Sequence, residues 1–183
     1  MNLKSLICYV VLGILLMGSG IVVSCDSFNE DLPECRLLVK FKYDYNMEFA
    51  DTFHAQVDKV ELYIFDKDGK FMFKQAEEGS ALSTGNYLME VELPVGQYQF
   101  MAWAGARDSY DITPLTPGVS TITDLKLKLK REASLIINKK METLWYGEII
   151  GVNFTGTEHQ TETINLIRDT KIVRFGFQSY TGT

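Results

Sequence analysis

The residue of this sequence that is best placed to undergo chemistry is Cys25, which directly follows a long apolar run. The run covers residues 6–23, Lys4 precedes it, and Asp26 ends the apolar region. A basic start, an apolar stretch and a small residue before the cut are the pattern of a secretory signal peptide. We therefore predict that residues 1–24 are a signal peptide, cleaved between Ser24 and Cys25, which would leave a thiol on the first residue of the mature chain.

The four residues around this cut, Val22-Val23-Ser24-Cys25, resemble the lipobox of bacterial lipoproteins. In that motif the cysteine sulfur is diacylated, so Cys25 is the expected lipid-attachment site. The alternative is an uncleaved transmembrane helix, because residues 6–23 reach about the minimum length, ~17 residues, that spans a bilayer. Three glycines within the run and the Ser-Cys pair at its end favour the lipoprotein signal.

The charge of the mature chain limits its partners. Without residues 1–24 it carries 17 basic and 24 acidic residues, a net charge of −7. Nucleic-acid binding requires clustered Lys and Arg to neutralise phosphates, so no nucleic-acid partner is expected. Attachment to the membrane would rest on the lipid, since several acyl chains anchor a protein stably. With Cys25 acylated, Cys35 is a single thiol, and a Cys25–Cys35 disulfide is possible only where lipidation fails.

A second candidate for chemistry is the acidic turn that begins at Asp66. Counted from Asp66, Asp68 and Glu77 fall at positions 3 and 12 of a calcium-binding loop, where that loop has carboxylate ligands. However, Lys70 and Met72 occupy positions 5 and 7, and glycine falls at position 4 instead of 6. A β-hairpin turn is the better interpretation of this segment.

The remaining candidates give no catalytic or cofactor-binding site. His54 and His159 are far apart in the sequence and have no Cys, Asp or Glu at metal-ligand spacing. No serine or cysteine stands in a nucleophile motif, and no glycine-rich phosphate loop is found. Trp103 and Trp145 could stack on sugars, although burial in a core is the commoner role of tryptophan. We therefore expect a protein that is not an enzyme and that has no cofactor or metal.

The elements that carry these residues are predicted to be β-strands. Residues 25–35 form an acidic tether, and after it apolar and polar residues alternate with a period of two, the pattern of half-buried strands. One short helical turn is expected within residues 45–56. The predicted strands are residues 37–43, 87–93, 98–104, 125–129, 133–138 and 161–167, together with a hairpin over residues 57–75 and a turn at 94–96 that pairs the second and third strands.

Strands at hairpin spacing predict an all-β fold, an antiparallel β-sandwich formed by residues 36–168. Its apolar positions should be mostly buried, and five of them are Phe41, Leu62, Val91, Phe100 and Leu127. Residues 171–178 alternate again, which indicates a further strand with no successor. Since an exposed apolar edge strand is normally avoided, residues 169–183 are interpreted as the first strand of a truncated second domain.

The sequence also resembles a known family, the FimB-like fimbrial anchor lipoproteins, which are minor-fimbrium anchoring subunits of type V pili. The resemblance runs from Cys25 to about Gln178 and departs from the family at the C-terminus, because family members continue through a second sandwich. The words that carry it are Cys25-Asp26-Ser27, Phe41-Lys42-Tyr43-Asp44-Tyr45-Asn46-Met47, Ile64-Phe65-Asp66-Lys67-Asp68-Gly69, Pro94-Val95-Gly96-Gln97-Tyr98, Ala102-Trp103-Ala104-Gly105, Leu144-Trp145-Tyr146-Gly147 and Ile164-Asn165-Leu166-Ile167-Arg168.

The resemblance implies a transthyretin-like sandwich on the cell surface, held in the outer membrane by a lipid on Cys25. It implies that fimbrial (pilin) subunits are the partners, that they bind by β-strand complementation, and that the protein attaches the base of a fimbrium and limits its length. The alternative function is a surface lipoprotein that binds glycans through Trp103 or Trp145.

Overall fold

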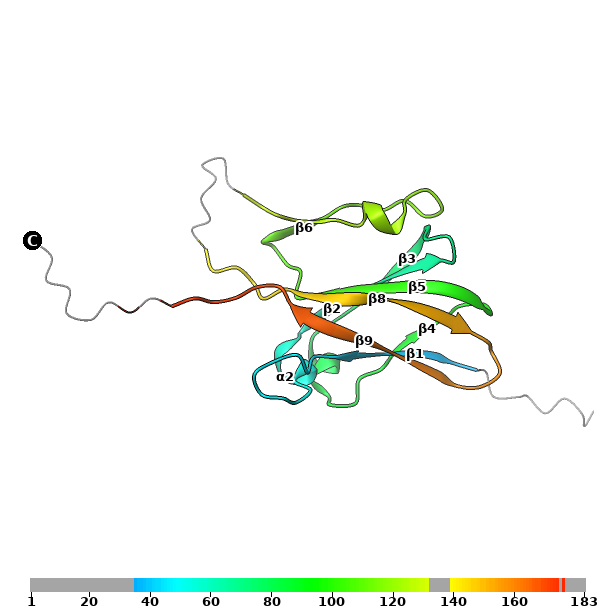
Figure 1. Ribbon diagram of the computed structural model, residues 1–183, viewed down its shortest axis with the longest axis horizontal. Coiled ribbons are helices and arrows are strands. Elements are labelled where there is room, and N and C mark those ends of the chain that lie inside the picture. Colours follow the sequence, from blue (N-terminus) through cyan, green and yellow to red (C-terminus); the bar gives the residue numbers. More distant parts are fainter. Residues whose placement is uncertain (1–34, 132–138, 175, 177–183) are drawn as a thin grey trace, which may run out of the picture. The chain divides into compact units, whose positions relative to one another are not determined.

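The structure is a computed structural model, and it describes residues 35–131, 139–174 and 176. The described residues are mainly β-strand with three short helical segments (Figure 1). The strands are β1 Leu37–Lys42, β2 Lys59–Asp66, β3 Phe71–Glu78, β4 Met89–Val91, β5 Gly96–Ala104, β6 Tyr110–Ile112, β7 Leu127–Leu129, β8 Trp145–Phe154 and β9 Gln160–Arg168. The helical segments are α2 Phe53–Gln56, η1 Ser80–Ser83 and η2 Ile122–Asp124. The prediction of an all-β fold is confirmed.

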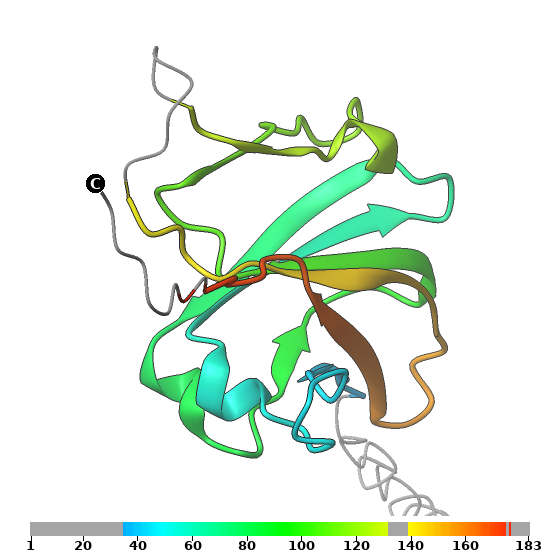
Figure 2. The same cartoon turned by 60° about the vertical axis from the view of Figure 1, so that its left-hand side comes forward.

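Seven of the strands form one sheet in the order β3-β2-β5-β8-β9-β1-β4, and β6 and β7 form a separate pair. The sheet curls, so that β9, β1 and β4 lie below β2, β3, β5 and β8 (Figure 2). The main core fills the space between these two halves and includes Phe41 of β1, Leu62 of β2, Phe100 of β5 and Ile164 of β9. Curling therefore lets one sheet supply both faces of a sandwich.

The outer face of β2 and β5 is covered as well. The β6–β7 pair and the loop between them lie over it (Figure 2), and Ile112, Leu115 and Ile122 pack there against Tyr63 and Met101. Six successive residues of β2 are buried for this reason, although their alternation predicts one exposed face. The unit therefore has three layers where a two-layer sandwich was expected.

The predicted hairpin over residues 57–75 is confirmed. β2 pairs antiparallel with β3, and Gly69 in the turn adopts a φ of 76°. Asp66 Oδ1 accepts hydrogen bonds from the backbone N–H groups of Asp68 and Lys70, both at 2.9 Å. The carboxylate of Asp66 thus closes a turn, which is the interpretation that the sequence favoured over a calcium loop.

The predicted pairing of the strands on either side of Pro94 is wrong. β4 pairs with β1 instead, while β5 lies between β2 and β8. Both edges of β5 are therefore occupied by partners that are distant in sequence, and the turn at residues 94–96 carries the chain from the lower half of the sheet to the upper half.

The prediction that all strands of the sandwich pair antiparallel is wrong at one place. β1 runs parallel to β9 over six residues, Leu37–Lys42 against Gln160–Asn165. Both strands consequently begin at one end of the unit and finish at the other (Figure 1). The chain enters at the first end, beside His159, and continues past β9 at the opposite end. The backbone N–H of Arg36 donates to Nδ1 of His159 at 3.2 Å, which fixes the start of β1.

Strand β8 was missed by sequence reasoning. Gly147 and Gly151 interrupt its alternation, and a register shift in β5 opposite β8 disturbs it further. The other predicted strands have counterparts in the structure, with two exceptions. Residues 133–138 lie outside the described residues. The strand predicted over residues 171–178 is wrong as far as it is described, because residues 171–174 and 176 belong to no strand. The short helical turn is confirmed as α2. Of the five predicted core residues, four are buried. Leu127 lies in β7 of the outer layer and is half-buried against the cluster of Ala106, Tyr110 and Leu144.

Candidate interaction surfaces

The predicted lipid site and cleavage site, Cys25 and Ser24, lie outside the described residues, as does the tether up to residue 34. Within the described part of the chain, no helix has the length and hydropathy needed to cross a membrane. Cys35 is half-buried and packs against the main core.

The histidines and carboxylates do not assemble into a site. His54 is exposed in α2, and His159 accepts the hydrogen bond that fixes Arg36. Across residues 35–131 and 139–174, no three His, Cys, Asp or Glu side chains are grouped so that they could hold a metal ion. The buried carboxylate of Glu61 is neutralised by Lys74 Nζ at 3.1 Å and Lys59 Nζ at 3.6 Å, and it accepts a hydrogen bond from the Tyr63 hydroxyl.

The two tryptophans contribute to packing. Trp145 is only 3% exposed and lies in the main core, edge-on to Tyr43. Trp103 is half-buried under the outer layer and meets Tyr146 edge-on at a centroid distance of 5.4 Å. Its indole nitrogen is itself buried. Trp145 is therefore closed to a sugar, and Trp103 is partly covered.

The most unusual surface is the loop that joins β1 to α2, residues 44–51, which we call the apolar loop. It presents three large side chains to solvent: Tyr45 is 79% exposed, Met47 91% and Phe49 90%. A folded protein normally buries such side chains, and a group of them on one surface marks an interaction site. Sequence reasoning did not single them out, because no periodic pattern distinguishes a loop side chain that faces solvent from one that is buried.

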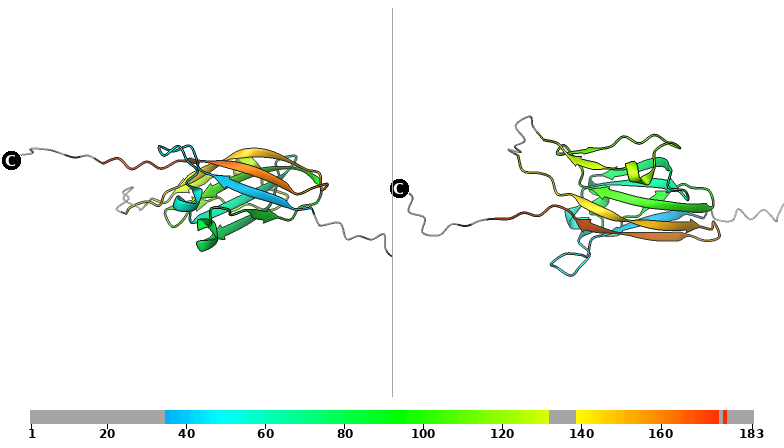
Figure 3. Two further views of the ribbon diagram at one scale, coloured as in Figure 1. Left: turned by 90° about the horizontal axis from the view of Figure 1, so that it is seen from below. Right: turned by 45° about the horizontal axis from the view of Figure 1, so that its top comes forward.

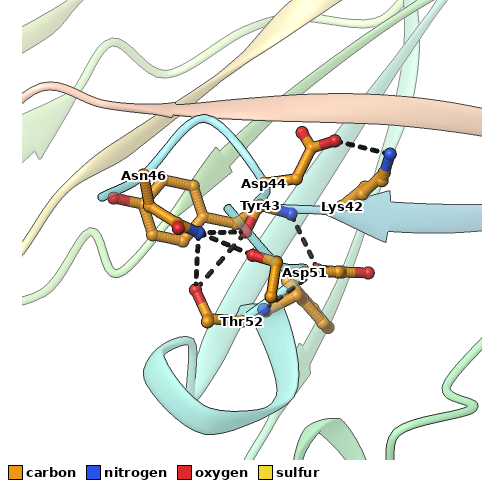
Figure 4. A network of polar contacts seen from close by, with 8 residues as sticks. Lys42, Tyr43, Asp44, Asn46, Asp51 and Thr52 are labelled. Atoms are coloured by element: carbon orange, nitrogen blue, oxygen red, sulfur yellow. Dashed lines mark hydrogen bonds and ion pairs between the residues drawn. The ribbon is translucent and has the colours of Figure 1, made fainter. Parts of the chain in front are cut away.

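A polar network holds the apolar loop in one conformation (Figure 4). Asn46 Nδ2 donates to the carbonyl oxygens of Tyr43 and Ala50, both at 2.8 Å, and to Thr52 Oγ1 at 3.0 Å. Asp51 Oδ1 accepts from the backbone N–H groups of Tyr43 and Phe53. The exposure of the three apolar side chains is thus a property of an organised loop.

The charged pair at the start of this loop is at the surface. Lys42 Nζ and Asp44 Oδ2 are 2.5 Å apart. The hydrogen bond from Lys42 is the main cause that holds the pKa of the Asp44 carboxyl below its ordinary value, and the same bond raises the pKa of Lys42.

Phe49 adopts a φ of 54°, a left-handed conformation that costs a non-glycine residue of order 1–3 kcal/mol.

The apolar loop forms one wall of a groove of about 880 Å³. The other wall is the end of β9 and the segment after it, including Ile167, Thr170 and Ile172. Figure 3 shows the blue loop that follows β1 beside the orange and red segment that follows β9. The groove therefore lies at the end of the unit that is opposite to the entry of the chain.

A second surface lies where the two ends of the curled sheet meet. β3 and β4 are the edge strands of the seven-stranded sheet, and within the described residues neither pairs with a strand on its outer side. A single hydrogen bond from Gln75 Nε2 to the carbonyl oxygen of Glu90, at 2.9 Å, joins them. A groove of about 440 Å³ opens here, lined by Phe73, Gln75, Glu90 and Glu92, and we call it the β3–β4 seam.

Comparisons with known proteins agree with this architecture. Over residues 32–183 the chain matches the family model of the fimbrillin-A associated anchor proteins Mfa1 and Mfa2. It is 29% identical over 131 residues to the minor fimbrium anchoring subunit Mfa2 of Porphyromonas gingivalis, a match that covers 69% of this chain and 40% of that protein.

Two solved structures are also similar. A Bacteroides thetaiotaomicron protein, assigned provisionally to polysaccharide binding, is 91% identical with a TM-score of 0.79, over 82% of this chain and 53% of that one. A Bacteroides ovatus protein, assigned provisionally as an adhesin, is 35% identical with a TM-score of 0.69, over 77% of this chain and 48% of that one. The chain thus spans about half the length of these relatives or less. Because the family model extends over most of the sequence, the chain belongs to the family of fimbrillin-A associated anchor proteins Mfa1 and Mfa2.

Proposed function

We propose that this protein attaches the base of a fimbrium to the cell surface and limits its length. Acyl chains on Cys25 hold it in the outer membrane, residues 25–35 span the distance to the folded unit, and a fimbrial subunit binds by adding a β-strand. Membership of the anchor family and the name of the P. gingivalis relative support this function. Occupying the strand-pairing edge of the basal subunit would stop growth at that end, which is how an anchor limits length.

The β3–β4 seam is the observation that supports binding of a fimbrial subunit by strand addition. The outer side of β3 is hydrogen-bonded at Phe71 to Ser120 and Gly118. Beyond Phe71, the described structure pairs neither β3 nor β4 with another strand on its outer side, and the side chain of Gln75 bridges the two. An incoming strand gains main-chain hydrogen bonds along such an edge, and its alternate side chains fill the adjoining groove. The half-buried ring of Phe73 offers an apolar contact, and Glu90 and Glu92 offer carboxylates to a basic side chain.

The seam can be tested with Gln75→Lys, which places a charged side chain in the groove and removes the bridge to Glu90. Inward-pointing charges at an edge block strand addition. We expect affinity for the fimbrial subunit of the same bacterium, measured by surface plasmon resonance, to fall by at least about tenfold, or ~1.4 kcal/mol. Gln97→Lys is the matched control, because Gln97 is exposed on β5 outside the seam. Equal affinity of Gln75→Lys and the parent would refute strand addition at the seam.

The membrane part of the proposal is tested at Cys25. Cys25→Ala should abolish the acyl mass in mass spectrometry and release the protein from outer-membrane fractions, since the anchor would then be missing. Retention of this variant in membranes without acyl groups would establish the uncleaved helix instead. This result is independent of fimbrial binding, so the two parts of the proposal can fail separately.

Glycan binding is the second candidate, and it rests on the provisional assignment of the 91%-identical relative. The burial of Trp145 and of the Trp103 indole nitrogen counts against it, because a stacking platform needs an open ring face. A shift of tryptophan fluorescence on addition of surface polysaccharides, lost in Trp103→Ala, would favour this function over fimbrial anchoring.

A further inference from the structure

The apolar loop presents three large apolar side chains that take no part in the core. Tyr45, Met47 and Phe49 point away from the core, yet the network around Asn46 fixes the backbone that presents them. Aromatic and methionine side chains are enriched at protein interfaces. A backbone that is already held in one conformation has less freedom to lose when such side chains are covered.

A second group of apolar side chains shares this surface. Ile172 and Val173, on the segment that leaves β9, are 61% and 68% exposed. Ile172 lines the same groove as the apolar loop. One partner seated in the groove could therefore cover side chains from both walls, residues 45–49 on one side and Ile172 on the other.

The course of the chain indicates which partner this is. The segment that forms one wall of the groove is the one that carries the chain onward after β9 (Figure 3). The 91%-identical solved protein matches this chain over only 53% of its own length, so it contains nearly as much polypeptide again. A domain joined to this unit through a short flexible linker has an effective concentration of the order of mM at the groove, which favours it over a partner that binds from solution.

We propose that the groove is the seat of the domain that follows this segment in the longer proteins of the family, and that Tyr45, Met47 and Phe49 are its anchors. The interface would be of the ordinary interdomain kind, roughly 600–1,500 Å². It lies at the end of the unit opposite to the entry of the chain, so the lipid tether and the second domain would be held on opposite sides of the first domain. The inference does not depend on the β3–β4 seam.

Trypsin provides the test, because Lys171 and Arg174 lie exposed on the segment beside the groove. Two chains are compared, both without residues 1–24 and with Cys25→Ser. The short chain ends at residue 183, and the long chain continues with the C-terminal part of the B. thetaiotaomicron relative. Proteolysis follows the population of the open form, so cleavage at these two residues should be at least about tenfold slower in the long chain.

The triple variant Tyr45→Ser, Met47→Ser and Phe49→Ser should restore rapid cleavage in the long chain. It should leave the melting temperature of the short chain unchanged, which shows that the first domain still folds. Val95→Ser with Val119→Ser is the matched control, since these exposed valines are not part of the groove. Protection that survives the triple variant, or equal cleavage of both chains, would overturn the proposal. A dimer of the short chain that the triple variant dissociates in sedimentation velocity would overturn it in favour of a second copy.

Discussion

At the scale of single residues, this protein uses side-chain hydrogen bonds to shape its loops. Asp66 closes the β2–β3 turn, Asn46 and Asp51 organise the apolar loop, and Asp124 closes the η2 turn through Thr121. Asx and Thr side chains suit this role, because they can replace main-chain partners in turns.

Asn46→Ala should loosen the apolar loop. It removes the three bonds that Nδ2 donates and the one that Oδ1 accepts from the Glu48 N–H. The free energy of unfolding should fall by about 1–3 kcal/mol, the usual cost of unsatisfied polar groups that are partly buried. Hydrogen exchange should rise within residues 44–52. Glu48→Ala is the control, because it keeps the backbone N–H, and an equal effect of both variants would contradict the role of Asn46.

The hydrogen bonds between Asp124 and Thr121 predict that the stability of the η2 turn, in the outer layer, depends on pH. Hydrogen bonds from Thr121, first from its backbone N–H at 2.8 Å and then from its hydroxyl at 2.9 Å, hold the pKa of the Asp124 carboxyl below its ordinary value. A carboxyl whose pKa is lowered by folding contributes stability above its unfolded pKa, near 3.8, and loses it as pH falls through the folded value. The NMR signal of the Thr121 amide should titrate below pH 3.8. Asp124→Asn should abolish this titration, and its persistence would assign the transition to another group.

At the scale of elements, β8 joins the two halves of the curled sheet. It pairs with β5 over its whole length and with β9 only from Trp145 to Gly147. The sheet separates beyond that point, which opens the space that the main core fills. Gly147 lies at this point, between Ala102 of β5 and Ile164 of β9.

Gly147→Ala should therefore be destabilising. A Cβ atom there would lie 2.7 Å from Ile164 Cγ2 and 2.9 Å from Ala102 Cβ, shorter than side chains tolerate. Overpacking of this kind typically costs about 1–3 kcal/mol, which denaturant unfolding can measure. Gly151→Ala on the same strand is the control, since nothing lies within 4 Å of its added Cβ. Similar losses at both positions would show that strand glycines matter through flexibility and not through contact.

At the scale of the whole molecule, the parallel pairing of β1 and β9 determines at which ends of the folded unit the chain enters and leaves. The chain enters at one end of the folded unit and continues at the other, beside the apolar loop and its groove. If the proposed lipid on Cys25 and the proposed second domain are present, this arrangement keeps them at opposite ends of the folded unit, so that they do not compete for the same surface.

Deleting residues 171–183 tests whether the segment after β9 contributes to the stability of the folded unit. Lys171–Arg174 are exposed and, as far as they are described, belong to no strand. We expect the deletion to improve solubility, because apolar residues such as Ile172 and Val173 are removed from the surface. The melting temperature of the first domain should change little. A large loss of thermal stability would place this segment in the first sandwich, and the prediction that it opens a second domain would be wrong.

The sequence by itself determined the fold class and most strands, because alternation with a period of two depends only on which side chains must avoid water. It also determined the β2–β3 hairpin, whose turn residues impose their own geometry, and the family. The cleavage site and the lipid on Cys25 remain predictions from the sequence, as does the domain boundary at residue 169.

Only the tertiary structure decided which strands pair. The partner of β4 is β1 and not its neighbour β5, and β1 is parallel to β9. Such contacts join residues that are distant in the chain, and no local pattern encodes them. The same holds for the three layers, since the alternation in β2 cannot show that β6 and β7 cover its outer face. Both candidate surfaces, the β3–β4 seam and the groove beside Tyr45, arise where segments distant in sequence meet, so only the folded chain could reveal them.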